Sequence, residues 1–194
     1  MSNVLIISAH HYYPFAEGKL NKTLAELAED SLKEKGHDVR IVNTEEDYDV
    51  ETELENHKWA DTVIIQTPMN WMMVTWSFKK YMDDVYTAGM CGALCNGDGR
   101  HHDAPKEGYG TGGTMSGKKY MLSITMNAPK EAFDDPKEYL FEGKSVDDLW
   151  LPMHANFKFF DMNPLPTFVC YDVMKNAEAE KDFERYKKHL DANF

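Results

Sequence analysis

The opening turn of a predicted helix is the first place where side chains could do chemistry. Lys19, Lys22 and Thr23 lie there, and Asn21 or a neighbour is expected to cap the helix. Because backbone N–H groups at a helix N-terminus favour negative charge, these residues indicate an anion site, with phosphate as the expected anion. The chain has no G-x-x-x-x-G-K-[ST] motif, and no G-x-G-x-x-G follows its first apolar run, which disfavours ATP or GTP hydrolysis and a Rossmann dinucleotide site.

Two further stretches could hold a planar ring system. Trp71 and Met72 follow a β-branched run, and Met126 and Asn127 follow a second apolar run. An indole, thioethers and an amide can together contact the face and the edge of a ring. Trp71 alone has an alternative interpretation, a buried aromatic plug, which its residue type supports equally well.

A metal site is the competing chemistry. Cys91 and Cys95 are spaced C-x-x-x-C, and His101 and His102 follow within ten residues. Zinc accepts such ligands. The residues lie in a glycine-rich stretch with no visible supporting shell, so we expect no metal there. No serine or cysteine lies on a nucleophile elbow, so acyl transfer has no support.

The composition is typical of a soluble globular chain, with 194 residues, 42% of them apolar and 28% charged. The net charge of −12 argues against nucleic acid and anionic membranes as partners. No apolar run is long enough for an export signal or a membrane span. The three cysteines cannot all pair, so we expect reduced thiols and a cytoplasmic location.

Strands and helices alternate along the chain, which predicts one α/β domain over residues 1–194. The predicted strands are short apolar runs, at 3–8, 38–43, 62–65, 118–125 and 165–171. The predicted helices are amphipathic or charged, at 20–35, 51–58, 76–85, 146–160 and 178–190. Right-handed crossovers and five strands favour the flavodoxin-like doubly wound parallel sheet, order 2-1-3-4-5, with helices on both faces.

This strand order predicts where the ligand binds. The loops 8–20, 67–74 and 125–128 follow the first, third and fourth strands, and ligands bind at the carboxyl ends of strands in such sheets. Residues 88–117 contain nine of the twelve glycines and show no periodicity. This insertion is too long for a routine connection, and we expect a functional loop at the same edge.

Motifs along essentially the whole chain resemble one family, the modulator of drug activity B family of flavodoxin-like-fold NAD(P)H:quinone oxidoreductases. The matching stretches keep their order: L-N-K-T-L (20–24), G-H-D-V-R-I-V (36–42), W-A-D-T-V-I-I-Q-T-P (59–68), W-M (71–72), K-K-Y-M-D-D-V (79–85), Y-G-T-G-G (109–113), G-K-K-Y-M-L-S-I-T-M-N-A-P (117–129) and L-P-T-F (165–168). The resemblance implies a homodimeric enzyme with non-covalently bound FAD that uses NADPH to reduce quinones by two electrons.

The resemblance also implies which residues contact FAD. These fall on four segments: Ala16, Glu17, Gly18, Lys19, Leu20, Asn21, Lys22 and Thr23; Met69, Asn70, Trp71 and Met72; Tyr109; and Thr125, Met126, Asn127 and Ala128. Tyr109 is also the candidate catalytic residue, in a flap expected to close against the flavin that carries the chemistry. No metal is implied.

The chain departs from the family pattern at several pocket positions. Met69 and Asn70 stand where the family commonly has Gly and Trp, and Met126 replaces a tryptophan. The first loop has residues of its own, His10, His11, Tyr12 and Tyr13, of which the histidines are expected to contact phosphate or their own loop. These departures bear on the choice of substrate more than on flavin binding.

The resemblance implies a ping-pong cycle, in which NAD(P)H reduces the flavin and leaves before the quinone enters the same position. Backbone N–H groups of residues 126–128 are candidates to stabilise charge near the flavin N1. The aromatic residues Trp76, Phe78, Tyr81 and 157–160 are expected to form the dimer interface, with burial in the monomer core as the alternative. Two other functions stay open: an FMN-binding electron carrier and a flavin-free regulatory protein of the same fold.

Overall fold

A parallel sheet forms the centre of the computed structural model, which describes all residues 1–194. Its strand order is β2 (Asp38–Asn43), β1 (Asn3–Ser8), β3 (Thr62–Pro68), β4 (Lys119–Thr125) and β5 (Asn163–Pro164), and β6 (Phe168–Cys170) also pairs with β4. The order 2-1-3-4-5 confirms the predicted flavodoxin-like fold class. The sixth strand is a small addition.

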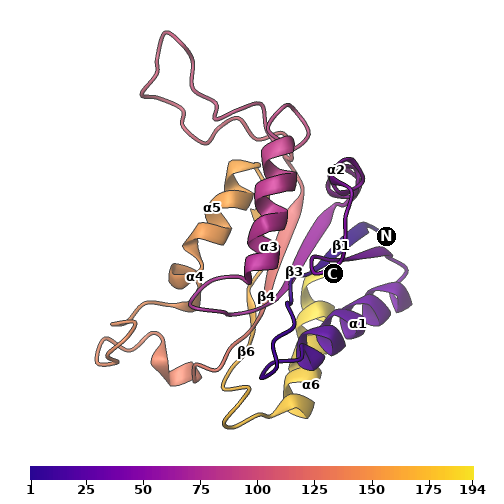
Figure 1. The fold of residues 1–194 in the computed structure, drawn as a ribbon, viewed down its shortest axis with the longest axis vertical. Helices are drawn as coiled ribbons and strands as arrows, with labels where there is room; N and C mark the ends of the chain where they lie inside the picture. The colour runs from indigo at the N-terminus through magenta and orange to yellow at the C-terminus, as the bar shows by residue number, and fades with distance from the viewer.

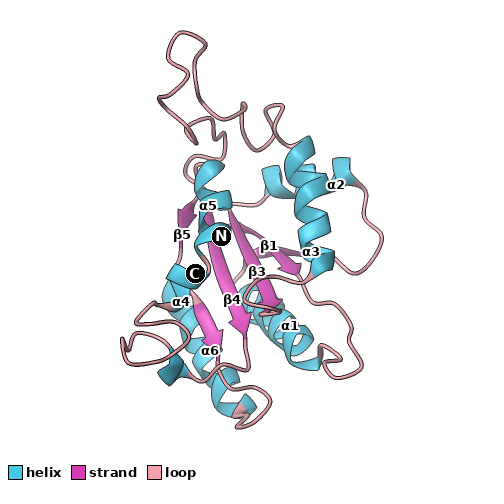
Figure 2. Cartoon of the chain, turned by 60° about the vertical axis from the view of Figure 1, so that its left-hand side comes forward, coloured by secondary structure: helices cyan, strands magenta, loops and turns pink.

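Helices cover both faces of the sheet (Figures 1 and 2). On one face, α1 (Lys19–Glu34) and α6 (Ala179–Asn193) pack on alternate side chains of the strands, such as Val4, Ile6 and Ile64. The other face is covered by α2 (Val50–Trp59), α3 (Trp76–Tyr81), α4 (Val146–Leu149) and α5 (Leu151–Phe159). Both faces are buried because strands β1 and β3 are apolar at consecutive positions, as expected for a parallel sheet.

The predicted starts and stops of the helices are largely confirmed. Thr75 caps α3, since its side chain accepts a hydrogen bond from the Phe78 N–H. Gly36 follows α1 with φ of +83°, a left-handed conformation that glycine adopts without strain. Helix α3 continues as one π-helical turn, η1 (Met82–Tyr86), and a short 3-10 helix, η2 (Lys130–Ala132), follows β4.

Two predicted elements are divided by proline. The helix expected at 146–160 is broken at Trp150, and Pro152 lies in the first turn of the second piece, which begins at Leu151. A proline within one continuous helix would clash with the carbonyl four residues earlier, but it fits a first turn. The strand expected at 165–171 is shortened to β6, and β5 lies just before it. Pro166, between the two, has no N–H group for the ladder.

The insertion at 88–117 lies at the opposite end of the sheet from the three converging loops (Figures 1 and 2). It joins η1 to the amino end of β4, and its base is fixed by hydrogen bonds from Asn96 N–H to Gly112 O (2.7 Å) and Met115 N–H to Phe160 O (2.9 Å). The expectation that the insertion lies at the ligand-binding edge of its own chain is therefore wrong. No helix has the length and apolarity needed to cross a membrane.

Candidate functional site

The loops after β1, β3 and β4 meet at the carboxyl edge of the sheet and enclose a cavity of about 280 Å³. Several predicted site residues line it: Ala16, Glu17, Gly18, Lys19, Leu20, Asn21, Met69, Asn70, Thr125, Met126 and Asn127. Others are not part of its wall: Lys22, Thr23, Trp71, Met72, Ala128 and Tyr109.

The N-terminus of α1 opens toward this cavity without a side-chain cap. Gly18 is the residue before the helix, with φ of +81°, and no side chain accepts a hydrogen bond from the first turn. The prediction that Asn21 caps the helix is wrong, since the Asn21 side chain is buried and bonded to Thr125 and Gln66. The first-turn N–H groups are thus available to an anion.

The lysines of this turn are exposed and paired with acids. Lys19 Nζ lies 2.6 Å from Glu17 Oε2, and this hydrogen bond lowers the pKa of the Glu17 carboxyl and raises that of Lys19. Lys22 Nζ lies 3.8 Å from Glu26 Oε1. The backbone of the helix start is therefore a better placed source of positive potential than these side chains.

The loop after β3 is a tight turn with Trp71 and Met72 at its tip. Asn70 and Met73 bond to each other across it, and the two residues between have φ of 48° and 61°. Residues other than glycine rarely adopt this backbone conformation, and strain of this kind is concentrated at functional sites. Trp71 is 90% exposed, so the buried-plug interpretation is wrong and the indole lies at the surface.

Hydrogen bonds join this turn to the other two loops. Asn70 Nδ2 donates to the Tyr13 hydroxyl over 3.2 Å, and Met69 N–H donates to Thr125 O over 2.7 Å. After β4, Met126 N–H donates to Cys170 O over 2.9 Å, whereas the N–H groups of Asn127 and Ala128 form no hydrogen bond within the chain. Of the backbone donors expected at 126–128, Met126 is therefore occupied and the other two are free.

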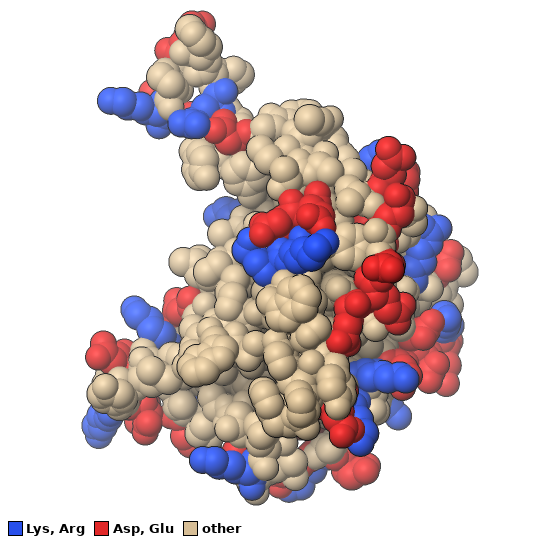
Figure 3. All heavy atoms as spheres, in the orientation of Figure 1, with Lys and Arg blue, Asp and Glu red and all other residues tan.

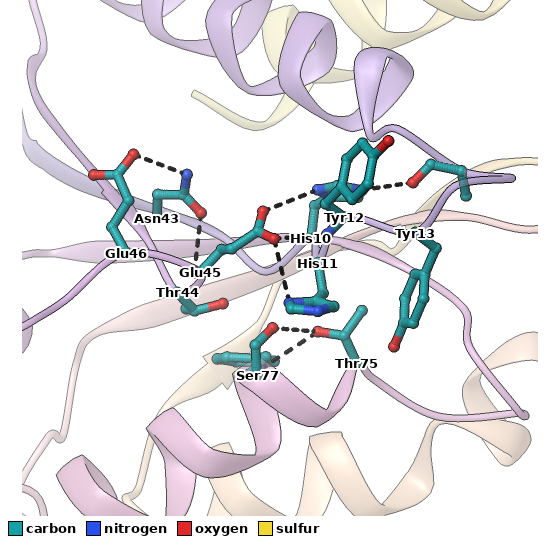
Figure 4. Close-up of polar contacts among 12 residues, drawn as sticks. His10, His11, Tyr12, Tyr13, Asn43, Thr44, Glu45, Glu46, Thr75 and Ser77 are labelled. Atoms are coloured by element: carbon teal, nitrogen blue, oxygen red, sulfur yellow. Dashed lines mark hydrogen bonds and ion pairs between the residues drawn. The ribbon is translucent and has the colours of Figure 1, made fainter.

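The two histidines of the first loop make contacts within the protein (Figure 4). Glu45, in the loop after β2, lies 3.4 Å from His11 Nδ1 and 3.9 Å from His10 Nδ1. His10 Nε2 also contacts Ala16 O at 3.2 Å, and its ring fills the space where a Cβ on Gly18 would stand. Glu45 therefore ties this loop to the neighbouring one.

Sequence reasoning missed part of the cavity wall. Tyr13 and Phe15 come from the first loop, and Val173 and Met174 from the segment after β6. The aromatic pair was visible in the sequence as a cluster next to the helix start. Val173 and Met174 had no local signal, because only the packing of β6 against β4 brings them to this edge.

Tyr109 lies in a second place, a groove of about 650 Å³ between η1 and α5. It is 72% exposed, and its ring centroid is 5.9 Å from that of Phe159. Around a cluster of acidic and basic side chains over α3, where Lys79 pairs with Asp83, the face over α3 and α5 carries mostly uncharged side chains (Figure 3). Phe78, Tyr81 and Phe157 do not contribute to it, because all three are fully buried in the monomer core, where the alternative interpretation placed them.

Cys91 is exposed, Cys95 is buried and neither is in a disulfide. Burial raises the pKa of the Cys95 thiol. No three histidine, cysteine or acidic side chains are grouped closely enough to hold a metal ion.

Comparison with known proteins decides the family. A family model described as "Flavodoxin-like fold" matches residues 2–194. The chain belongs to this family. Among curated flavodoxin-like relatives, NADPH:quinone oxidoreductase MdaB of Haemophilus influenzae is 43% identical over 192 residues, which are 99% of both chains. The resemblance inferred from the sequence motifs is confirmed by this match.

Solved structures of flavodoxin-like proteins agree on the fold. A Klebsiella pneumoniae protein named as a candidate quinone reductase superposes with a TM-score of 0.77 at 24% identity, covering 99% of this chain and 85% of that one. General stress protein 14 of Treponema denticola, solved in complex with FMN, gives a TM-score of 0.65 at 18% identity and covers 99% of both chains. At these identities the likeness shows the fold alone.

Proposed function

We propose that this protein is a flavin-dependent NADPH:quinone oxidoreductase. The observation that carries the proposal is the uncapped N-terminus of α1, which opens into the cavity formed by the loops after β1, β3 and β4. The full-length relationship to an NADPH:quinone oxidoreductase supports the reaction class. FAD as the flavin and NADPH as the co-substrate follow from the family resemblance.

The cavity suits a flavin in its donor groups and its shape. The free N–H groups of the α1 turn would hold the phosphates. Asn127 and Ala128 have unbonded N–H groups, which would lie at the ring edge where negative charge develops. Met69, Asn70, Trp71 and Met72 would border the ring, and the exposed indole at the rim leaves an apolar face for a second planar molecule.

A flavin held by these loops would supply the two-electron transfer from NADPH to a quinone. The chain's own contribution is to orient the ring, exclude water and place backbone donors at the developing charge. We propose that both substrates use the same position beside Trp71, which gives a ping-pong cycle. Met126, which by the sequence resemblance stands in place of a tryptophan, would make the wall of this position more adaptable.

We also propose that the working unit is a homodimer in which Tyr109 serves the partner's flavin. Within one chain, Tyr109 belongs to the groove beside α5 and to the insertion at 88–117, which lies at the edge of the sheet opposite the cavity (Figure 1). A flap role for this residue therefore requires a second copy. The apolar groove, lined by residues such as Met82, Met90 and Phe159, is the surface we expect that copy to cover.

The unpaired cysteines support the proposed cytoplasmic location, where thiols stay reduced. The proposed partners are limited to a quinone, NAD(P)H and a second copy of the chain.

Purified protein tests the proposal directly. We expect a visible flavin spectrum, FAD on cofactor extraction and steady-state turnover of menadione with NADPH. An electron carrier would bind FMN and show no such turnover. A flavin-free regulatory protein would stay colourless after addition of FAD, and either result would contradict the proposal.

A further inference from the structure

Four buried polar side chains form a continuous row behind the cavity. Ser123 Oγ donates to Gln66 Oε1 over 2.7 Å, Gln66 Nε2 donates to Asn21 Oδ1 over 2.9 Å, and Asn21 Nδ2 donates to Thr125 Oγ1 over 3.0 Å. Gln66 and Ser123 are 0% exposed, Thr125 is 3% exposed and Asn21 is 5% exposed. Each bond is thus shielded from solvent. In the protein interior hydrogen bonds are stronger than in water, and unpaired polar groups are costly.

The row connects the three elements that shape the site. Asn21 is in the first turn of α1, Gln66 is on β3, and Ser123 and Thr125 are on β4. The register pairs Gln66 with Ser123, so their bond runs across two neighbouring strands. Neither of these two residues lines the cavity, whereas Asn21 and Thr125 do.

The bonds run in one direction. Gln66 Oε1 accepts from Ser123, so its amide N–H faces Asn21 Oδ1, and this leaves the Asn21 amide N–H to face Thr125. Thr125 Oγ1 accepts over 3.0 Å and donates its own proton to Asn21 Oδ1 over a longer 3.3 Å, an acceptor that it shares with Gln66. Because this outgoing bond is long and its acceptor is shared, an oxygen in the cavity can compete for the Thr125 proton.

We propose that Gln66 and Ser123 are positioning residues for the cofactor. They fix the amide of Asn21, which in turn makes the Thr125 hydroxyl a donor to an oxygen on the polar chain between the flavin ring and its phosphate. This inference rests on the proposed flavin function. Two of the four members of the row, Asn21 and Thr125, line the cavity, which a row that served only core stability would not require.

The test compares flavin binding by cofactor-depleted protein and its variants. Gln66→Met keeps the length of the side chain and removes both polar ends, so Asn21 Oδ1 loses its nearer donor and should hold the Thr125 proton more strongly. We expect the flavin Kd to rise about tenfold, the effect of one lost hydrogen bond in a buried site. Thr125→Val should raise the Kd by a similar factor, and Thr125→Ser should restore wild-type binding.

Two readouts separate positioning from stability. The double variant Gln66→Met/Thr125→Val should bind flavin about as well as either single variant, since both changes remove the same bond. The visible band of the bound flavin should shift alike in both single variants. As a matched control, Asn56→Leu removes a buried amide on α2, away from the cavity, and should lower Tm with no change in flavin Kd.

The outcomes distinguish the two proposals. Additive losses in the double variant, or wild-type affinity in Gln66→Met, would overturn the row's role and leave the flavin proposal standing. If the wild-type protein binds no flavin, both are wrong. Should Gln66→Met not fold, Ser123→Ala gives the same test, with an expected rise in Kd of about threefold, and an unchanged Kd would overturn the role.

Discussion

Replacing Gly18 by alanine should lower the free energy of unfolding more than the same replacement at Gly117. Gly18 has φ of +81°, and a Cβ there would stand 2.2 Å from the His10 ring. The left-handed conformation costs a residue with a Cβ about 1–2 kcal/mol. Displacing the ring, together with its contacts to Ala16 and Glu45, adds about 1–3 kcal/mol, as overpacking in other proteins does.

Gly117→Ala is the matched control, since Gly117 has φ of +83° and nothing lies within 4 Å of the added Cβ. The control should lose only the conformational term. For a chain of this length each kcal/mol lowers Tm by about 2–4 °C, so the two variants should differ by about 2–12 °C.

Thermal unfolding of cofactor-depleted protein measures that difference, and flavin titration adds a second readout. Because His10 lines the cavity, Gly18→Ala should also weaken flavin binding, whereas Gly117→Ala should not. Equal Tm values for the two variants would refute the reasoning that the His10 ring occupies the space above Gly18.

Five further predictions concern other parts of the molecule. Lys22→Glu reverses a charge in the first turn of α1 and should weaken flavin binding by about 1 kcal/mol at low salt; an unchanged affinity would argue against phosphate at this helix. Tyr109→Phe should alter quinone turnover modestly and leave flavin bound. A Cys91→Ser/Cys95→Ser variant should keep its fold and activity. Loss of folding or activity in this variant, matched by loss of wild-type activity with a chelator, would contradict the expectation that the two cysteines bind no metal. Light scattering at micromolar concentration should give a dimer mass, and a monomer would rule out the shared site. Burial lowers the pKa of His57 from 6.5 to about 4, so between those pH values the unfolded chain binds the extra proton. The free energy of unfolding, measured with urea, should therefore fall by up to about 3 kcal/mol as pH falls through that window. His57→Leu should lose this part of the pH dependence.

The sequence by itself determined the elements and their order. The runs at β1, β3 and β4 are too short for helices and apolar at consecutive positions, which suits only strands with both faces covered. Handedness of the crossovers then left few strand orders. The helix start at Trp76 was readable from the capping residue Thr75, and the start of α1 was readable to within one residue from amphipathic spacing, because both are local properties.

The rules for connections in parallel sheets also predict where the insertion at 88–117 lies. A segment that joins a helix to the start of a parallel strand must lie at the amino edge of the sheet, so the insertion at 88–117 could have been placed opposite the cavity. The glycine content of the insertion suggested a functional loop, and this is why the insertion was expected at the ligand-binding edge of the sheet.

Tertiary structure alone decided the fine arrangement of the site. Trp71 lies outside because the turn between Asn70 and Met73 takes left-handed φ values, which no local pattern around an aromatic residue predicts. Gln66 and Ser123 were visible only as polar interruptions of apolar strands. Their role depends on the strand register, which brings these two residues, 57 positions apart, into one hydrogen bond, and on the packing of α1, which places the Asn21 amide next to Gln66. Periodicity in a sequence reports which face a residue occupies, whereas the partner on that face depends on how separate elements pack.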